Sequence, residues 1–121
     1  MLFEREALFE AIRNSRKLQV LLEAEGWEVG DVLAKATEEL GEFSEAVQIA
    51  RGKITNKTQD VDEPFCEAAD VIICMVDALA RIYPEKPASE IYVLLLSSVD
   101  RKCAKWVNKV EERARELEDT N

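Results

Sequence analysis

Apolar residues recur every three or four positions along most of this chain, which is the spacing of one face of an α-helix. Four segments carry the pattern, and turn residues separate them. We expect helices over residues 2–24, 32–51, 64–82 and from 88 onward. Gly26 and Gly52 suit helix ends, Asp31 suits an N-cap, and Pro64 suits a first turn. No segment alternates as a strand would. The pattern therefore predicts an all-α fold in a single domain, residues 1–121.

The fourth segment is the longest, and its apolar residues form a seam at spacings of four or three. The seam consists of Tyr92, Leu96, Val99, Cys103, Trp106, Val110, Ala114 and Leu117. Such a seam is typical of helix packing, including packing against another subunit. The last turns, residues 115–121, are highly charged, and we expect them to project from the core or to fray.

Two carboxylate residues of the second expected helix point from its apolar face. On a helical wheel of about 100° per residue, Glu39 and Glu42 lie about 60° apart, on the same side as Val32 and Phe43. Glu38 lies on the flank of this face, closer to solvent. The apolar face of this helix therefore carries an acidic pair at spacing i, i+3.

The third expected helix, EAADVIICMVDALA, is apolar around nearly its whole circumference and should be buried on most sides. Glu67, Asp70 and Asp77 fall within an arc of about 80° on it. A buried carboxylate needs a cation, a hydrogen-bond donor or a raised pKa. Two interpretations of Asp77 stay open: it joins the edge of the acidic cluster, or it pairs with a Lys or Arg.

Two successive helices that each present an acidic pair from an apolar face indicate one shared cation. Its ligands would be Glu39, Glu42, Glu67 and Asp70. Ligation by oxygen alone favours a hard ion, Mg²⁺ or its substitute Mn²⁺. The loop between the helices carries Arg51, Lys53 and Lys57. These cations are either solvated or reach a phosphate group.

Composition excludes several classes of function. The formal charge of −9 argues against a general nucleic-acid binder, and no run of about 20 apolar residues could span a membrane. The N-terminus lacks the apolar core of a signal peptide, so we expect a cytoplasmic protein. The chain has no histidine, which removes His-based catalysis and the Glu-x-x-His ligands of di-iron bundles. Its three cysteines contain no CxxC pair, and we expect buried, reduced thiols.

KATEELGEFSEAV followed by EAADVIICMVDALA resembles the MazG-like all-α nucleoside triphosphate pyrophosphohydrolase superfamily, whose signature is EExxE, a spacer, then ExxD. The similarity covers roughly residues 30–82. It implies a four-helix bundle-like core, a homodimer or homotetramer, and Mg²⁺-dependent hydrolysis of a nucleoside triphosphate to the monophosphate and pyrophosphate. In the family, the acids that match Glu39, Glu42, Glu67 and Asp70 hold the metal, the same four that the helical wheels select.

The resemblance also suggests roles for other residues. Glu38 or Glu39 would take the proton of the attacking water, and Lys35 would contact a phosphate. Lys53 of the loop, taken from its basic cluster and not from the resemblance, is a further candidate for a phosphate contact. The fourth helix of the family commonly offers basic residues and Asn to the phosphates, for which the candidates here are Lys102, Lys105 and Asn108. Their spacing departs from the familiar patterns, which leaves the substrate open. Two alternatives stay open: a phosphoribosyl-ATP pyrophosphatase-like enzyme, and a non-catalytic helical interaction protein with a residual metal site.

Overall fold

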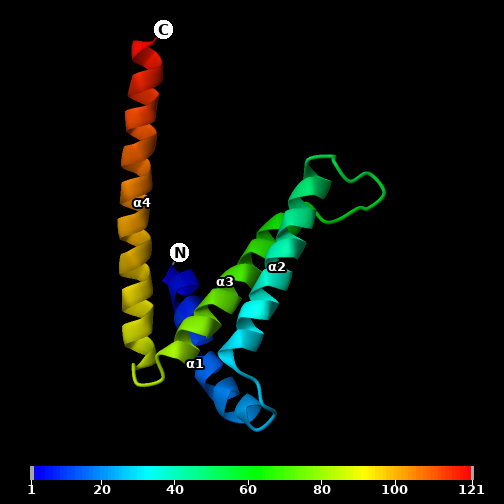
Figure 1. Cartoon of the computed structure of the whole chain (residues 1–121), viewed down its shortest axis with the longest axis vertical. Helices are drawn as coiled ribbons and strands as arrows, with labels where there is room; N and C mark the ends of the chain where they lie inside the picture. Colours follow the sequence, from blue (N-terminus) through cyan, green and yellow to red (C-terminus); the bar gives the residue numbers. More distant parts are fainter. Residues whose placement is uncertain (1, 121) are drawn as a thin grey trace.

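The computed structural model of the protein describes residues 2–120, and of residues 2–6 and 23 it describes the backbone alone. Four helices make up the chain: α1 (Leu2–Glu23), α2 (Val29–Ala50), α3 (Glu63–Ile82) and α4 (Ala88–Asp119) (Figure 1). Within residues 2–120 there is no strand. The all-α prediction is confirmed, as are the four helices.

The ends of the helices follow the turn residues, with one correction. Gly26 and Gly52 adopt φ of 77° and 75°, and Lys53 N–H donates to the Gln48 carbonyl oxygen across the end of α2 (2.9 Å). The prediction of Asp31 as the N-cap of α2 is wrong, because the helix starts earlier, at Val29. The Asp31 carboxylate accepts the Glu28 backbone N–H instead (2.7 Å), so it stabilises the first turn from within.

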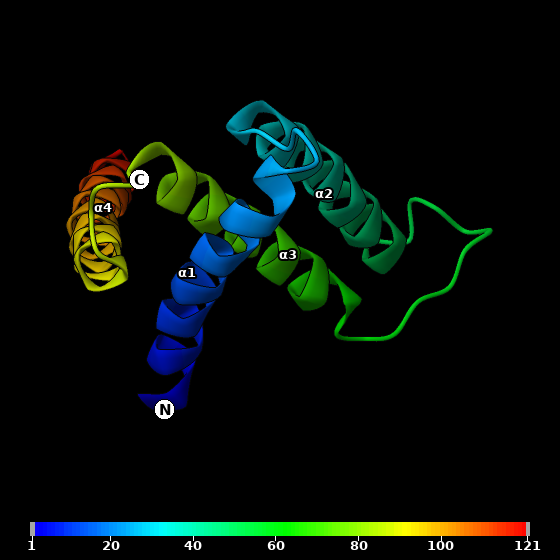
Figure 2. The same cartoon turned by 90° about the horizontal axis from the view of Figure 1, so that it is seen from below.

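Helix α3 lies at the centre and packs against each of the other three helices (Figures 1 and 2). Its longest contact is with α2, which runs beside it, whereas α1 crosses it on another side. No contact between α4 and α2 occurs in the described part of the chain. One chain therefore presents an α2–α3 hairpin, with α1 packed on α3 and α4 packed on both α1 and α3. The closed bundle core implied by the resemblance stays a prediction.

The hydrophobic core lies where α1, α3 and α4 meet. Ile12, Val76, Ala80 and Ile91 are buried there, and Tyr92 packs edge-on against Phe9 with ring centroids 5.5 Å apart. Val32 and Ala46 of α2 are also buried, but they are not part of this core. The core thus fixes α3 against α1 and α4, and leaves the acidic residues of the hairpin outside it.

Much of the apolar surface is left uncovered in a single chain. Ile72, Ile73 and Met75 of α3 are exposed, although the sequence predicts burial on most sides of this helix. The three cysteines are free, as expected, but Cys66 and Cys103 are exposed rather than buried. Periodicity identifies which face of a helix is apolar, and burial depends on whether another element covers it. No helix in the described chain is long and apolar enough to cross a membrane.

Helix α4 leaves the rest of the molecule after its first turns (Figure 1). All residues from 101 to 120 are exposed. Residues 115–119, where the sequence analysis expects projection or fraying, are helical and exposed. The distal half of α4 is thus an exposed arm.

Candidate metal centre

Three of the four predicted metal ligands converge between α2 and α3. Glu39 from α2 and Glu67 and Asp70 from α3 each place a carboxylate oxygen so that all three lie within 4.8 Å of one another. The side-by-side packing of the two helices produces this arrangement, because Glu67 and Asp70 are one turn apart on α3 and share a face. Glu39 is buried, whereas Asp70 is exposed, so the cluster is closed at one side and open to solvent at the other.

The carboxylates of this cluster have unused oxygens. Glu39 is 8% exposed; its Oε1 lies 3.2 Å from the Lys35 ammonium, but its Oε2 is buried without a hydrogen-bond partner among the described residues. Oε2 of Glu67 is likewise buried and unpartnered. A buried carboxylate oxygen without a donor is costly, and a cation between these oxygens would compensate it. The donor set therefore fits a hard divalent ion.

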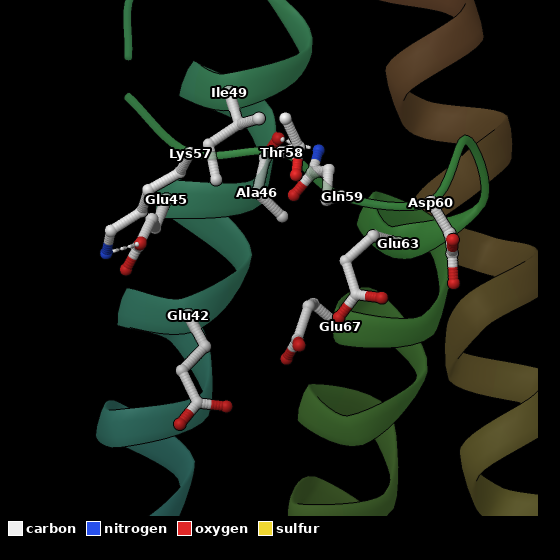
Figure 3. Close-up of a pocket in the computed structure, with 10 residues that line it drawn as sticks. All are labelled: Glu42, Glu45, Ala46, Ile49, Lys57, Thr58, Gln59, Asp60, Glu63 and Glu67. Carbon is white, nitrogen blue, oxygen red and sulfur yellow. Dashed lines mark hydrogen bonds and ion pairs between the residues drawn. The ribbon is translucent and has the colours of Figure 1, made fainter. Parts of the chain in front are cut away.

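Glu42, the fourth predicted ligand, lies next to the triad without being part of it. The charge of Glu39 and a hydrogen bond between the two carboxyl groups raise the pKa of Glu42. Glu42 and Glu67 both project into the space between the helices, from opposite sides (Figure 3). Glu42 is thus placed to take part in binding a cation or its ligands.

Glu63 is a residue that the sequence analysis missed. A hydrogen bond with Glu63, together with burial and the charge of Glu42, raises the pKa of Glu67 to about 7. Glu63 therefore favours the protonated form of Glu67 when no metal is bound. The sequence could have indicated this neighbour, because Glu63 precedes Glu67 by one helical turn and so lies on the same face of the helix.

A pocket of about 700 Å³ adjoins the acidic cluster (Figure 3). It lies between the second half of α2, the loop after it and the start of α3. Its lining consists of Glu42, Glu45, Ala46, Ile49, Lys57, Thr58, Gln59, Asp60, Glu63 and Glu67. The Gln59 side-chain amide donates to the Ala46 carbonyl oxygen (2.8 Å) and holds the loop against α2. The volume is within the range of small-molecule sites.

Two lysines belong to this region. Lys35 lies 3.2 Å from Glu39 and 3.8 Å from Glu38, and the hydrogen bond to Glu39 raises the Lys35 pKa. Lys57 lines the pocket and pairs with Glu45. Lys53, which the sequence analysis named, is exposed and does not line the pocket. Of the loop cations Arg51, Lys53 and Lys57, Lys57 is thus the one that lines the pocket.

The remaining predicted residues lie elsewhere or on the flank. Glu38 is exposed, as its wheel position predicts. Lys102, Lys105 and Asn108 lie on the exposed part of α4, and within the described chain α4 does not contact α2. A single chain therefore does not bring these three residues to the acidic cluster.

Asp77 is not part of the cluster. Its Oδ1 accepts a hydrogen bond from Arg81 Nε (3.1 Å) and another from the Ser15 hydroxyl of α1. The Arg81 side chain is 6% exposed and that of Asp77 24% exposed. Of the two interpretations open for Asp77, the structure shows the ion pair, and the Ser15 hydroxyl links this pair to α1.

Comparisons with protein-family models, with curated proteins and with solved structures found no match for this chain. The function must therefore be argued from the residues and geometry of the site.

Proposed function

We propose that this chain is a Mg²⁺-dependent nucleoside triphosphate pyrophosphohydrolase of the MazG-like all-α type, which converts a (d)NTP and water to the (d)NMP and pyrophosphate. One observation carries the proposal. Carboxylates of Glu39, Glu67 and Asp70 converge from two helices, with buried unpartnered oxygens, beside a polar pocket of about 700 Å³. The EExxE and ExxD residues of the motif resemblance supply these carboxylates.

The ion would be held by Glu39, Glu67 and Asp70, with Glu42 beside them. When bound, Mg²⁺ supplies positive charge against the phosphate oxygens and favours attack of water on phosphorus. A divalent ion suits this site because the acids near it are in excess over the lysines. Mn²⁺ has the same preference for oxygen ligands and would substitute.

Residues of the chain itself would contact the phosphates and accept the proton. Lys35 lies against Glu38 and Glu39, so its ammonium would exchange part of this pairing for a phosphate oxygen when substrate binds. Lys57 would do the same from the loop side of the pocket. The proton lost by the attacking water would pass to Glu38 or Glu39, while pyrophosphate leaves from the same phosphorus. The open side at Asp70 gives the triphosphate access.

The test is pyrophosphate release from the eight canonical (d)NTPs and dUTP, with and without Mg²⁺. Asp70→Asn is the informative variant, because Asp70 is exposed and its loss relieves repulsion between neighbouring carboxylates without disturbing the core. Glu90→Gln is a matched control, since Glu90 is exposed and pairs with Lys86 at the start of α4. We expect Mg²⁺-dependent release in the wild type and the control, and none in Asp70→Asn. Undiminished release from Asp70→Asn would overturn the site assignment.

A second candidate is a helical interaction protein in which the metal site is structural. The exposed apolar residues of α3 and α4 favour it, because such surfaces mark contacts with partners. Metal binding without release of pyrophosphate from any nucleotide, phosphoribosyl-ATP included, would support this candidate. Release from phosphoribosyl-ATP alone would identify the narrower enzyme instead.

The same surfaces support the expected homodimer or homotetramer. Phe65, Ile72, Ile73 and Met75 of α3 are exposed on a helix whose sequence is apolar on nearly every side. A second copy would remove these side chains from water. Light scattering on the purified chain would measure the mass of the assembly.

A further inference from the structure

Among the described residues, the distal part of α4 has no partner that covers it. Ala88, Ile91, Tyr92 and Leu95, at the start of the helix, pack on the core. Residues 101–120 are all exposed, and the helix extends beyond the other three (Figure 1). In proteins, most of the stability of a helix comes from packing of its amphipathic face. A partner that covers one face of the arm would therefore stabilise it.

The seam of apolar residues continues along this arm. Val99, Trp106, Val107, Val110 and Leu117 are exposed, and the Trp106 indole is 67% exposed. Spacings of three and four place most of these side chains on one stripe, which is the geometry of a two-helix contact. The stripe is narrow, so a single helix would cover it.

The charges of the arm are segregated along its length. Residues 101–110 carry four basic residues and no acid: Arg101, Lys102, Lys105 and Lys109. Residues 111–119 carry five acids and two arginines: Glu111, Glu112, Glu116, Glu118, Asp119, Arg113 and Arg115. The boundary falls at Val110, close to the middle of the exposed arm.

We propose that α4 pairs antiparallel with α4 of a second copy of this chain, with Val110 near the centre of the contact. In this direction the basic half of each arm faces the acidic half of its partner. A parallel pair would place basic against basic and acid against acid. Surface charges contribute little affinity. They can still favour the antiparallel over the parallel orientation, because both orientations bury the same apolar seam.

Cys103 distinguishes the two directions. It lies on the seam, seven residues before Val110. In the antiparallel pair the two Cys103 residues are 14 residues apart along the contact, or about 20 Å. In a parallel pair they face each other. A disulfide requires Cα atoms within about 7 Å, so the parallel pair alone permits a bond between the two Cys103 thiols.

The experiment is oxidative crosslinking of the full chain in a Cys66→Ser, Cys74→Ser background. Three single-cysteine proteins are compared: native Cys103, and Val110→Cys or Asn108→Cys, the last two each with Cys103→Ser. Asn108 is the matched control, because it is exposed and lies two residues, about 200°, away from Val110 around the same helix. All substitutions on α4 are at exposed positions, and circular dichroism checks the helix content.

We expect a covalent dimer from Val110→Cys, and none from native Cys103 or Asn108→Cys. Crosslinking of both Cys103 and Val110→Cys would show a parallel pair and overturn the proposal. Crosslinking of none would show that another surface or another protein covers the arm, which also overturns it. The readout does not involve nucleotide hydrolysis, so its failure leaves the proposed activity standing.

Discussion

Arg81→Met tests the assignment of Asp77 to a structural ion pair rather than to the metal centre. The substitution keeps most of the side-chain volume but leaves the Asp77 carboxylate with the Ser15 hydroxyl alone. Removing one partner of a buried ion pair costs about 3–5 kcal/mol. We take the lower end, about 3 kcal/mol, because the Asp77 side chain is 24% exposed and Arg81 Nη2 has no partner among the described residues.

The assay is urea and thermal unfolding followed by circular dichroism, at one protein concentration for all variants. For a domain of this size, about 3 kcal/mol corresponds to a fall in Tm of about 10 °C. Replacing both members, Asp77→Leu with Arg81→Met, should recover most of the loss, because no uncompensated charge is then left. Arg113→Met is the control: Arg113 and Glu116 form an ion pair at 70% and 65% exposure, and its loss should cost less than about 1 kcal/mol.

Arg81→Met should leave the response to Mg²⁺ unchanged, since Asp77 and Arg81 lie outside the acidic cluster. The reasoning is refuted if Arg81→Met costs no more than Arg113→Met, or if it weakens Mg²⁺ binding as much as Asp70→Asn does.

The remaining predictions concern the acidic cluster, the core and a turn. Folding raises the pKa of Glu67 from 4.5 to about 7, so its protonation stabilises the metal-free fold. This contribution is complete below pH 4.5 and is lost as the pH rises through about 7, and the free energy of unfolding measured across this window should fall accordingly. Protons compete with the metal, so Mg²⁺ affinity by calorimetry should weaken as pH falls through about 7. Ile12→Ala should cost about 4 kcal/mol by urea unfolding, because Ile12 is fully buried in the core. Gly52→Ala should lower the free energy of unfolding by about 1 kcal/mol, because alanine is strained at a φ of 75°. No atom obstructs the new Cβ, so no steric cost adds to this backbone strain.

The sequence predicted what depends on local chemistry. Gly52 marks the end of α2 because the turn there needs positive φ, and Pro64 lies in the first turn of α3 where its missing N–H costs nothing. Helical spacing also placed Glu39, Glu67 and Asp70 on faces that meet. These features follow from a few neighbouring residues, which a sequence displays directly.

The errors arose where a residue's environment depends on distant elements. Asp31 is a good N-cap residue, but its carboxylate also stabilises a helix from the third position, and Glu28 takes the cap. Cys66 and Cys103 follow the apolar pattern of their helices, yet both are exposed. The substrate-binding roles of Lys102 and Lys105 stay predictions, because within the described chain α4 does not contact α2 and no local pattern determines the direction of α4.

Mn²⁺ binding tests the metal centre most directly, because free and bound Mn²⁺ differ in their electron paramagnetic resonance signal. Wild type, Asp70→Asn and the control Glu90→Gln should be titrated under the same conditions, without nucleotide. We predict one tight site in the wild type and in Glu90→Gln, and an affinity lower by about tenfold or more in Asp70→Asn. Equal affinity in all three proteins, or no tight site in the wild type, would contradict a metal centre at Glu39, Glu67 and Asp70.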